Sequence, residues 1–308
     1  MVVVTVLLLT ELKHTFTEFA QRMKNDEMIT LAKFLAISGI ILPMLPHKNL
    51  IPDINLTPYS IWLATVVVSG ISYLSYLLKR YVFHESGTLV SGIIGGLYSS
   101  TATISVLARK SRKASEQEAT DYVAAMLLAV SMMFLRFMIL ILIFSREIFL
   151  SIYPYLLTMA VVAAIVAWFI HSRQKRPEDQ SAETEEDDSS NPLEFKVALI
   201  FAVLFVIFTF LTHYTLVYAG TGGLNLLSFV SGFSDITPFI LNLLQNTGSV
   251  AALIITACSM QAIISNIMVN MFYALFFAGK GSKLRPWILG GFGVVIACNL
   301  VLLLFFYI

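Results

Sequence analysis

Residues 86–113 read SGTLVSGIIGGLYSSTATISVLARKSRK, a stretch long enough to cross a bilayer, which takes about 20 residues. Its composition differs from that of an ordinary span. Glycines crowd its first half, hydroxyl side chains that lipid cannot satisfy follow, and basic residues close it. They are Gly87, Gly92, Gly95 and Gly96, then Ser99, Ser100, Thr101 and Thr103, then Arg109, Lys110, Arg112 and Lys113. A chain tolerates this at membrane depth only where it faces protein or water, so we interpret the stretch as half of a transport site.

The whole chain has the composition of a polytopic membrane protein. Of its 308 residues 57% are hydrophobic and 13% charged, whereas soluble domains carry about 25% charged residues. The predicted fold class is therefore all-α, a helical bundle with the lipid bilayer as its partner. The net charge of +1 hides an acidic run over 178–188 in a chain that is otherwise basic, and basic loops here indicate topology rather than nucleic-acid binding. The cysteines and histidines lack the spacing of a metal site, and no cofactor is predicted.

Hydropathy divides the chain into four parts. Residues 1–56 hold a partial span, an interfacial amphipathic helix over 11–27 and a first span. Residues 57–170 and 194–308 form two membrane repeats, and residues 171–193 form an acidic disordered linker between them. The predicted membrane segments are 29–46, 57–79, 86–108, 119–145, 149–170, 194–219, 222–246, 248–278 and 285–308.

The two repeats share one plan: three spans and one glycine-rich, broken or re-entrant segment. SGIIGGLYSSTATISVL (91–107) in the first corresponds to LSFVSGFSDITPFILNL (227–243) in the second. If 86–108 and 222–246 each enter and return on one side, all the basic loops and the acidic linker lie in the cytoplasm of a bacterium, and the repeats are inverted in its inner membrane. A parallel repeat of full spans is the alternative.

Two charged residues sit deep inside apolar segments. Asp235 lies between Ser234 and Thr237, and Pro238 disrupts the turn before it. An acid inside a membrane is by default a functional hypothesis, here a cation ligand or a proton carrier. Arg136 is the matching charge in the first repeat. Two interpretations have equal weight. Asp235 is a transport-site acid whose charge Arg136 balances, or the two residues form a purely structural ion pair.

The segment 248–278 carries polar residues on one helical face, namely Thr256, Ser259, Asn266 and Asn270. Amides facing lipid cost several kcal/mol each, so this face is expected to point inward. It either lines a polar pathway or hydrogen-bonds neighbouring helices. The Gly92-x-x-x-Gly96 pattern also has a structural interpretation besides a transport site, because small residues at this spacing allow helices to pack closely.

Three motifs carry a resemblance to a known family: ILPMLP (41–46), GGLYSSTATISVLARKSR (95–112) and GFSDITPFI (232–240). The chain resembles the multi-spanning membrane domain of unknown function found in bacterial MgtC/SapB-family proteins, without most of the N-terminal MgtC domain. That family often has a second acidic residue at the position of Thr237 and a basic residue near Asn270. This chain has neither, so the resemblance gives less support to a charged ion site here. The resemblance implies only a weak link to magnesium physiology.

The predicted function is a membrane transporter or channel for a small solute, foremost an inorganic ion, with its site between the two glycine- and hydroxyl-rich segments. The candidate ligands are Ser99, Ser100, Thr101, Thr103, Ser234, Asp235, Thr237, Asn266 and Asn270. Half-helix N-termini favour anions whereas carboxylates and free carbonyls favour cations, so the sign of the ion and any metal stay open. The alternative is a scaffold or regulatory subunit that binds another membrane protein or anionic lipid. Catalytic motifs are missing, so we expect no enzyme, and a homodimer is an open possibility.

Overall fold

The computed structural model describes residues 25–51, 54, 56–83, 87–112, 114, 116–173, 195–245, 250–279 and 284–307. The partial span at the N-terminus and nearly all of the acidic linker lie outside these residues. So does the interfacial helix predicted over 11–27, except for its last three residues, which begin the first described helix.

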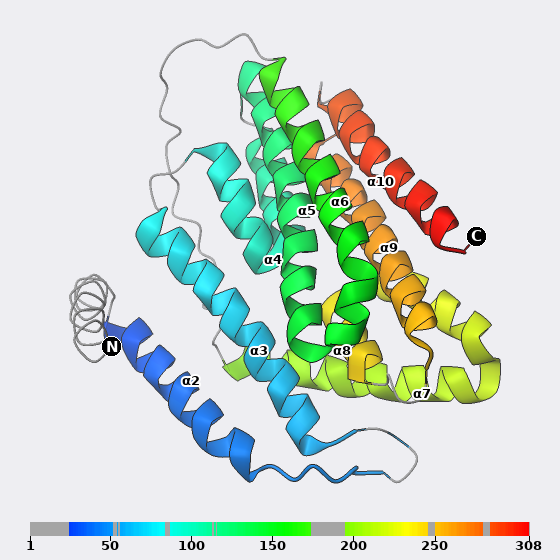
Figure 1. Ribbon diagram of the computed structural model, residues 1–308. Coiled ribbons are helices and arrows are strands. Elements are labelled where there is room, and N and C mark those ends of the chain that lie inside the picture. The colour runs from blue at the N-terminus through cyan, green and yellow to red at the C-terminus, as the bar shows by residue number, and fades with distance from the viewer. Residues whose placement is uncertain are drawn as a thin grey trace, which may run out of the picture.

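Within the described residues the protein is helical, as predicted, and the only extended pairing is a single bridge between Ile51 and Ile54 (Figure 1). In the part of the chain that the structure describes, eight helices are long and apolar enough to cross a membrane. The elements are α2 (Asn25–Met44), α3 (Pro58–Leu77) with a π-helical extension η1 (Leu78–Val82), α4 (Thr88–Lys110), α5 (Glu116–Phe144), α6 (Arg146–Ser172), α7 (Phe195–Ser231), α8 (Ile236–Gln245), α9 (Ala252–Ala278) and α10 (Arg285–Tyr307).

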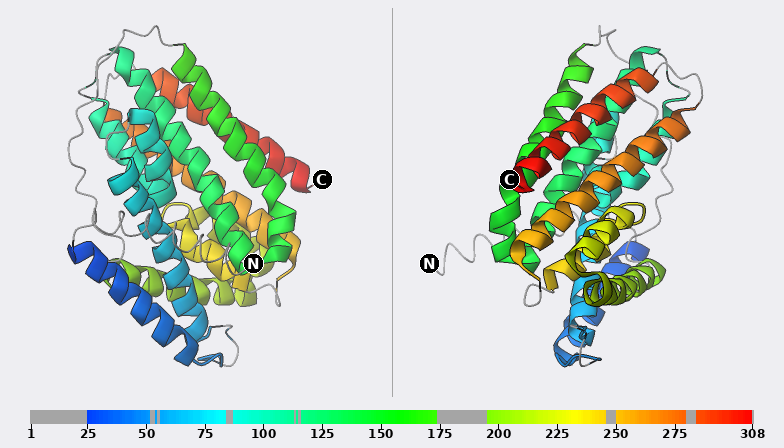
Figure 2. Two further views of the ribbon diagram at one scale, coloured as in Figure 1. Left: turned by 60° about the vertical axis from the view of Figure 1, so that its left-hand side comes forward. Right: turned by 90° about the vertical axis from the view of Figure 1, so that its right-hand side faces the viewer.

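The helices α4, α5, α6, α9 and α10 form the bundle that holds most of the core (Figures 1 and 2). Polar contacts inside it join neighbouring helices. Ser131 on α5 donates to the carbonyl of Ala160 on α6 at 2.7 Å, and Tyr155 on α6 donates to Oδ1 of Asn299 on α10 at 2.5 Å. Side-chain hydrogen bonds of this kind satisfy polar groups that lipid would leave unpaired.

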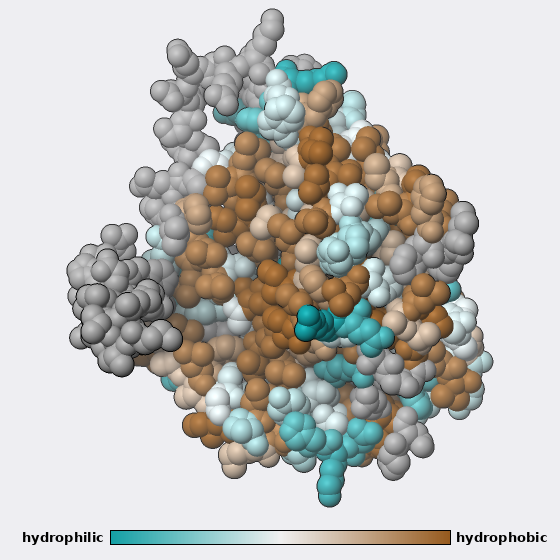
Figure 3. Space-filling model, viewed as in Figure 1, coloured by the Kyte–Doolittle hydropathy of each residue, from teal (hydrophilic) through white to brown (hydrophobic). Residues whose placement is uncertain are grey.

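The outer face of the bundle is apolar. Large apolar side chains such as Ile139, Leu157 and Trp168 are exposed on α5 and α6. Figure 3 shows brown side chains covering much of the face over these helices, with hydrophilic ones gathered near helix ends. An exposed surface of this kind suits lipid rather than water, which agrees with a multi-pass membrane protein.

The helix α7 departs from the predicted layout. Gly220 has φ +60° and ψ −152°, a conformation almost exclusive to glycine, and the chain turns there. The part ahead of that turn, which holds the predicted segment 194–219, is apolar and long enough to cross a membrane, and it runs across the lower part of the molecule in Figure 1 at an angle to the bundle. Its orientation follows from contacts with α8, where Asn242 donates to Oγ1 of Thr209 at 2.6 Å and Phe208 packs against Phe239.

The segment predicted over 222–246 is two helical pieces rather than one. Its first part continues α7 beyond Gly220 to Ser231, and its second part is α8, which at 10 residues is too short to span a membrane. Residues 232–235 separate the two pieces. The break therefore falls within GFSD, directly before the proline-containing turn at which the sequence predicts one.

Candidate functional site

The helix α4 folds back on itself at Ser99. Ser99 has φ −159° and ψ 107°, an extended conformation inside a helix. Gly95 and Thr103 stand eight residues apart, which is about 12 Å along a straight helix. In the structure a Cβ atom on Gly95 would lie only 2.5 Å from Oγ1 of Thr103. The two halves of α4 therefore form a tight hairpin whose tip is Ser99.

Each break begins a new helix with a polar cap. Oγ of Ser99 accepts a hydrogen bond from the backbone N–H of Ala102 at 3.3 Å. Oδ1 of Asp235 accepts one from the N–H of Thr237 at 2.9 Å. Serine and aspartate are favoured N-cap residues because they satisfy an N–H group that the first turn leaves free. Ser99 and Asp235 thus occupy equivalent places in the two segments that the sequence aligns.

The carbonyl groups at the other side of each break also have partners. Arg136 on α5 donates from NH1 to the carbonyl of Tyr98 at 2.7 Å. On α9, Ser265 donates to the carbonyl of Phe229 at 2.6 Å, and Asn266 donates to that of Gly232 at 3.2 Å. One long helix in each half of the chain therefore supports the broken segment of the same half.

Close backbone packing fixes these supports. A Cβ atom on Gly92 would lie 2.3 Å from the carbonyl oxygen of Ala125, and one on Gly96 would lie 2.5 Å from the Cα of Ala129. The Gly92-x-x-x-Gly96 pattern thus packs α4 against α5, the alternative that the sequence left open. In the second half, a Cβ atom on Gly232 would lie 2.3 Å from the side chain of Ser265.

The two breaks face one cavity of about 400 Å³. Its walls come from α3, α4, α5, α7, α8, α9 and the turn 232–235. In Figure 1, α4 approaches this region from the upper half of the molecule and α8 from the lower half. Eight residues predicted from the sequence line the cavity: Ser99, Ser100, Thr101, Arg136, Ser234, Asp235, Thr237 and Asn266.

Two predicted ligands do not line the cavity. Thr103 lies against Gly95 inside the α4 hairpin. Asn270 is fully buried and donates to Oδ1 of Asn266 at 3.2 Å. Both therefore support the site rather than face it. Thr256 and Ser259 bond to carbonyls of their own helix, so of the polar face predicted on α9 only Asn266 reaches the cavity.

Arg136 and Asp235 both line the cavity, and each forms a hydrogen bond with the backbone at the break in its own half of the chain. Arg136 donates to the carbonyl of Tyr98, and Asp235 accepts from the N–H of Thr237. Nε of Arg136 is buried and has no hydrogen-bond partner. The guanidinium therefore retains donor capacity beyond its structural bond.

Several lining residues escaped the sequence reasoning. Ser69 and Ser72 contribute buried hydroxyls from α3. With Thr65 they repeat at helical spacing, and this pattern was a usable signal. Ser265, which supports the second break without lining the cavity, offered no such signal, because a single serine in an apolar helix does not indicate which carbonyl it will meet.

The donor set of the site consists of hydroxyls, an amide, one carboxylate and one guanidinium. In the part of the chain that the structure describes, no group of three or more histidine, cysteine, aspartate or glutamate residues is placed to hold a metal ion. The arrangement is suited to binding a small polar or charged solute.

Comparisons place the chain among related proteins. A family model described as "Domain of unknown function (DUF4010)" matches residues 66–278, which is more than half of the chain and includes both breaks. A protein of Aquifex aeolicus (strain VF5), described as an uncharacterized protein, is 25% identical over 227 residues, covering 72% of this chain and 96% of that protein. No solved structure matches the chain.

Proposed function

The chain belongs to the DUF4010 family, and on that premise we propose that it is an integral membrane transporter or channel for a small solute, foremost an inorganic ion. One observation carries the proposal: two broken helices, one from each half of the chain, present their breaks to a single polar cavity. Helices broken at membrane depth are a recurring plan for substrate sites in transporters.

The cost of this arrangement supports a functional role. A break inside a membrane exposes backbone groups that cost several kcal/mol each unless paired, and the chain supplies Arg136, Ser265 and Asn266 to pair them. A scaffold needs only uninterrupted helices. An intramembrane charge such as Arg136 is likewise expensive and is found where a pathway or a ligand needs it.

We further propose that both broken segments are re-entrant and that the halves are inverted repeats. The N-terminal end of α5 and the C-terminal end of α6 lie together through the contact of Asp121 with His171. Arg112, just after α4, donates to the carbonyls of Phe276 and Phe277 at the end of α9. The described basic residues at these helix ends, Arg109, Lys110, Arg112 and Arg173, therefore support one basic end of the bundle, which the positive-inside rule would assign to the cytoplasmic side of a bacterial inner membrane.

Three narrower statements remain predictions. They are the link to MgtC/SapB-type proteins, the absence of enzymatic activity and the formation of a homodimer. The sidedness is tested with single cysteines in a chain whose Cys258 and Cys298 are replaced by alanine. A cysteine at Arg173 is expected to react only with a permeant reagent in intact cells, and one at Lys48 also with an impermeant reagent. The reverse pattern contradicts the proposed orientation.

Transport itself is tested in liposomes that contain the purified full chain, with Na⁺, K⁺ and Cl⁻ as tracer ions. Thr101 lines the cavity, so Thr101→Phe is expected to fill it and to lower flux at least about tenfold. The matched control is Ser105→Phe, one turn further along the same half-helix and outside the cavity wall. Equal flux in the two variants, or no flux of any of these ions through the folded wild-type protein, overturns the proposal in favour of the scaffold.

A further inference from the structure

We propose that the cavity selects a small anion, either a halide or a compact oxyanion. This inference rests on the proposed transport function and specifies its substrate class. The sequence leaves the sign of the ion open, because a broken helix offers N–H donors on one side and carbonyl acceptors on the other. The structure distinguishes the two sides by showing which of these groups are already used.

Three carbonyl acceptors at the breaks are occupied by side-chain donors. The carbonyls of Tyr98, Phe229 and Gly232 each accept a hydrogen bond from a side chain of α5 or α9. Hard cations such as Na⁺ and Ca²⁺ need several oxygen ligands free to coordinate them. At Tyr98 the partner is itself a cation, which places a positive charge where a bound metal ion would have to sit.

Two N–H donors at the break in α4 lack a helical partner. Ser100 and Thr101 are the first two residues after the break in α4, so their N–H groups have no carbonyl one turn earlier to bond to. The cap from Ser99 reaches only Ala102. Both residues line the cavity and add a hydroxyl each. A helix N-terminus of this kind attracts negative charge.

The guanidinium of Arg136 is the second and independent observation. It lines the same cavity, and its Nε is buried without a hydrogen-bond partner. The guanidinium donates to the carbonyl of Tyr98 through NH1 and has further N–H groups, so an anion in the cavity would accept a charge-assisted bond from one of these. Asp235 offsets part of the charge, but one of its oxygens already caps α8. One carboxylate thus faces a guanidinium and two helix N-termini.

The test measures both ion signs in the same proteoliposomes. Vesicles loaded with KCl are diluted into potassium gluconate or sodium salts, and Cl⁻ efflux is followed with a silver chloride electrode while K⁺ and Na⁺ fluxes are followed with tracers. Wild-type protein is expected to conduct Cl⁻ and nitrate and to exclude both cations. Thermal unfolding in detergent is expected to shift upward with NaCl over sodium gluconate, which reports binding separately from transport.

Three variants identify the groups responsible. Arg136→Gln is expected to lower Cl⁻ flux at least about tenfold, and Arg136→Lys is expected to restore much of it because the charge returns. Asp235→Asn keeps an N-cap side chain and removes the competing negative charge, so it is expected to raise Cl⁻ flux severalfold. Arg146→Gln, at an exposed position outside the cavity, is the control for the loss of an arginine.

The possible failures are distinguishable. Flux of K⁺ or Na⁺ without Cl⁻ overturns anion selection and leaves the transport function standing. Loss of a cation flux in Asp235→Asn would likewise overturn anion selection and leave the transport function standing. A folded protein that conducts neither sign overturns the transport function and the anion site with it. Equal Cl⁻ flux in Arg136→Gln and the wild-type protein removes Arg136 from the site.

Discussion

The carbonyl oxygen of Tyr98 accepts a hydrogen bond of 2.7 Å from NH1 of Arg136, a residue on the neighbouring helix. The carbonyl is available because Ser99 leaves the helical conformation directly after it. Each partner would be costly alone, since a membrane interior penalises both an unpaired carbonyl and an unpaired guanidinium. The break in α4 and the charge on α5 therefore stabilise one another.

This relationship predicts the stability of an Arg136→Met variant. Methionine fills a similar space but leaves the carbonyl of Tyr98 without its donor, so unfolding is expected to become easier by about 1–3 kcal/mol. The measurement is the thermal or denaturant-induced unfolding of the purified protein in detergent. Arg146→Met, at an exposed position, should leave the unfolding transition in place, and an unchanged transition in Arg136→Met would contradict the role of this bond.

The packing of α4 on α5 predicts opposite effects for one substitution at two glycines. Gly92→Ala places a methyl group 2.3 Å from the carbonyl oxygen of Ala125 and is expected to destabilise the protein by about 1–3 kcal/mol through overpacking. Gly70→Ala on α3 meets nothing within 4 Å and is expected to stabilise it by up to about 1 kcal/mol. Unfolding measurements on the pair check both signs, and a stabilised Gly92→Ala protein would disprove the close approach.

The turn inside α7 predicts a strict requirement at Gly220. Its φ of +60° with ψ of −152° is a region that alanine enters only with strain, so Gly220→Ala is expected to cost about 1–3 kcal/mol. Gly222→Ala, two residues further along, meets nothing within 4 Å and serves as the control. Comparable unfolding transitions in the two variants would show that α7 does not turn at Gly220.

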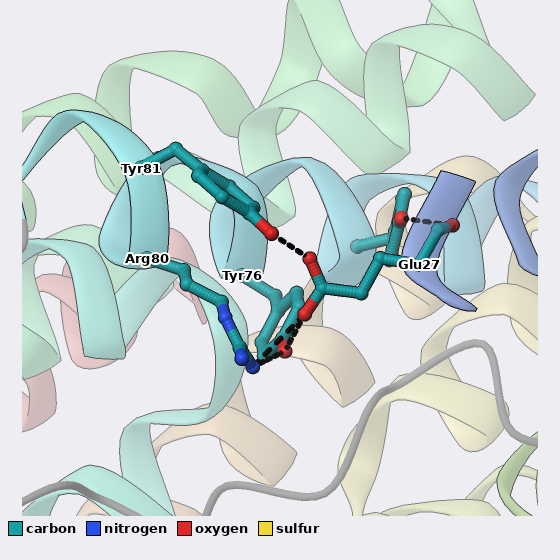
Figure 4. A network of polar contacts seen from close by, with 5 residues as sticks. Glu27, Tyr76, Arg80 and Tyr81 are labelled. Carbon is teal, nitrogen blue, oxygen red and sulfur yellow. Dashed lines mark hydrogen bonds and ion pairs between the residues drawn. The ribbon is translucent and has the colours of Figure 1, made fainter. Parts of the chain in front are cut away.

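The start of α2 is held by a buried carboxylate. Figure 4 shows Glu27 between Tyr76, Arg80 and Tyr81, with Oε1 accepting from Tyr76 at 2.8 Å and pairing with NH1 of Arg80 at 2.9 Å. Tyr81 donates to the other oxygen. Glu27→Gln removes the charge and one acceptor, and is expected to loosen α2 by an amount on the order of 1–3 kcal/mol.

Hydrogen exchange of the α2 amides measures this loosening. Faster exchange confined to α2 and the end of α3 is the expected result for Glu27→Gln. The control is Glu147→Gln, which changes an exposed carboxylate at the start of α6. Exchange rates in α2 that match those of the control would contradict the role of Glu27.

Local chemistry in the sequence was sufficient to locate both broken segments and eight of the residues that line the cavity. Glycine and hydroxyl residues around Ser99, and an acid beside proline around Asp235, mark backbone that cannot stay helical in lipid, and such backbone has to face a shared polar space. This prediction did not require knowledge of which helices are neighbours, because polar residues and broken backbone inside a membrane must face protein or water rather than lipid.

Residues whose role depends on a distant partner could not be placed. Thr103 has the composition of a ligand, yet its position is decided by how tightly α4 folds back on Gly95. Ser265 meets the carbonyl of Phe229 only because α7 ends there. The crossing direction of α7 follows from single contacts such as Asn242 with Thr209, which hydropathy does not report.

The glycine contacts have a mechanical consequence. Gly96 meets the backbone of α5 at Ala129, and Gly232 meets α9 at Ser265, so neither broken segment can slide along its supporting helix without steric collision. Each broken segment and its supporting helix are therefore expected to stay together as one unit. On the proposed transport function, we expect the cavity to open between these two units, where Tyr98 and Ser234 line it, by rocking rather than by shear.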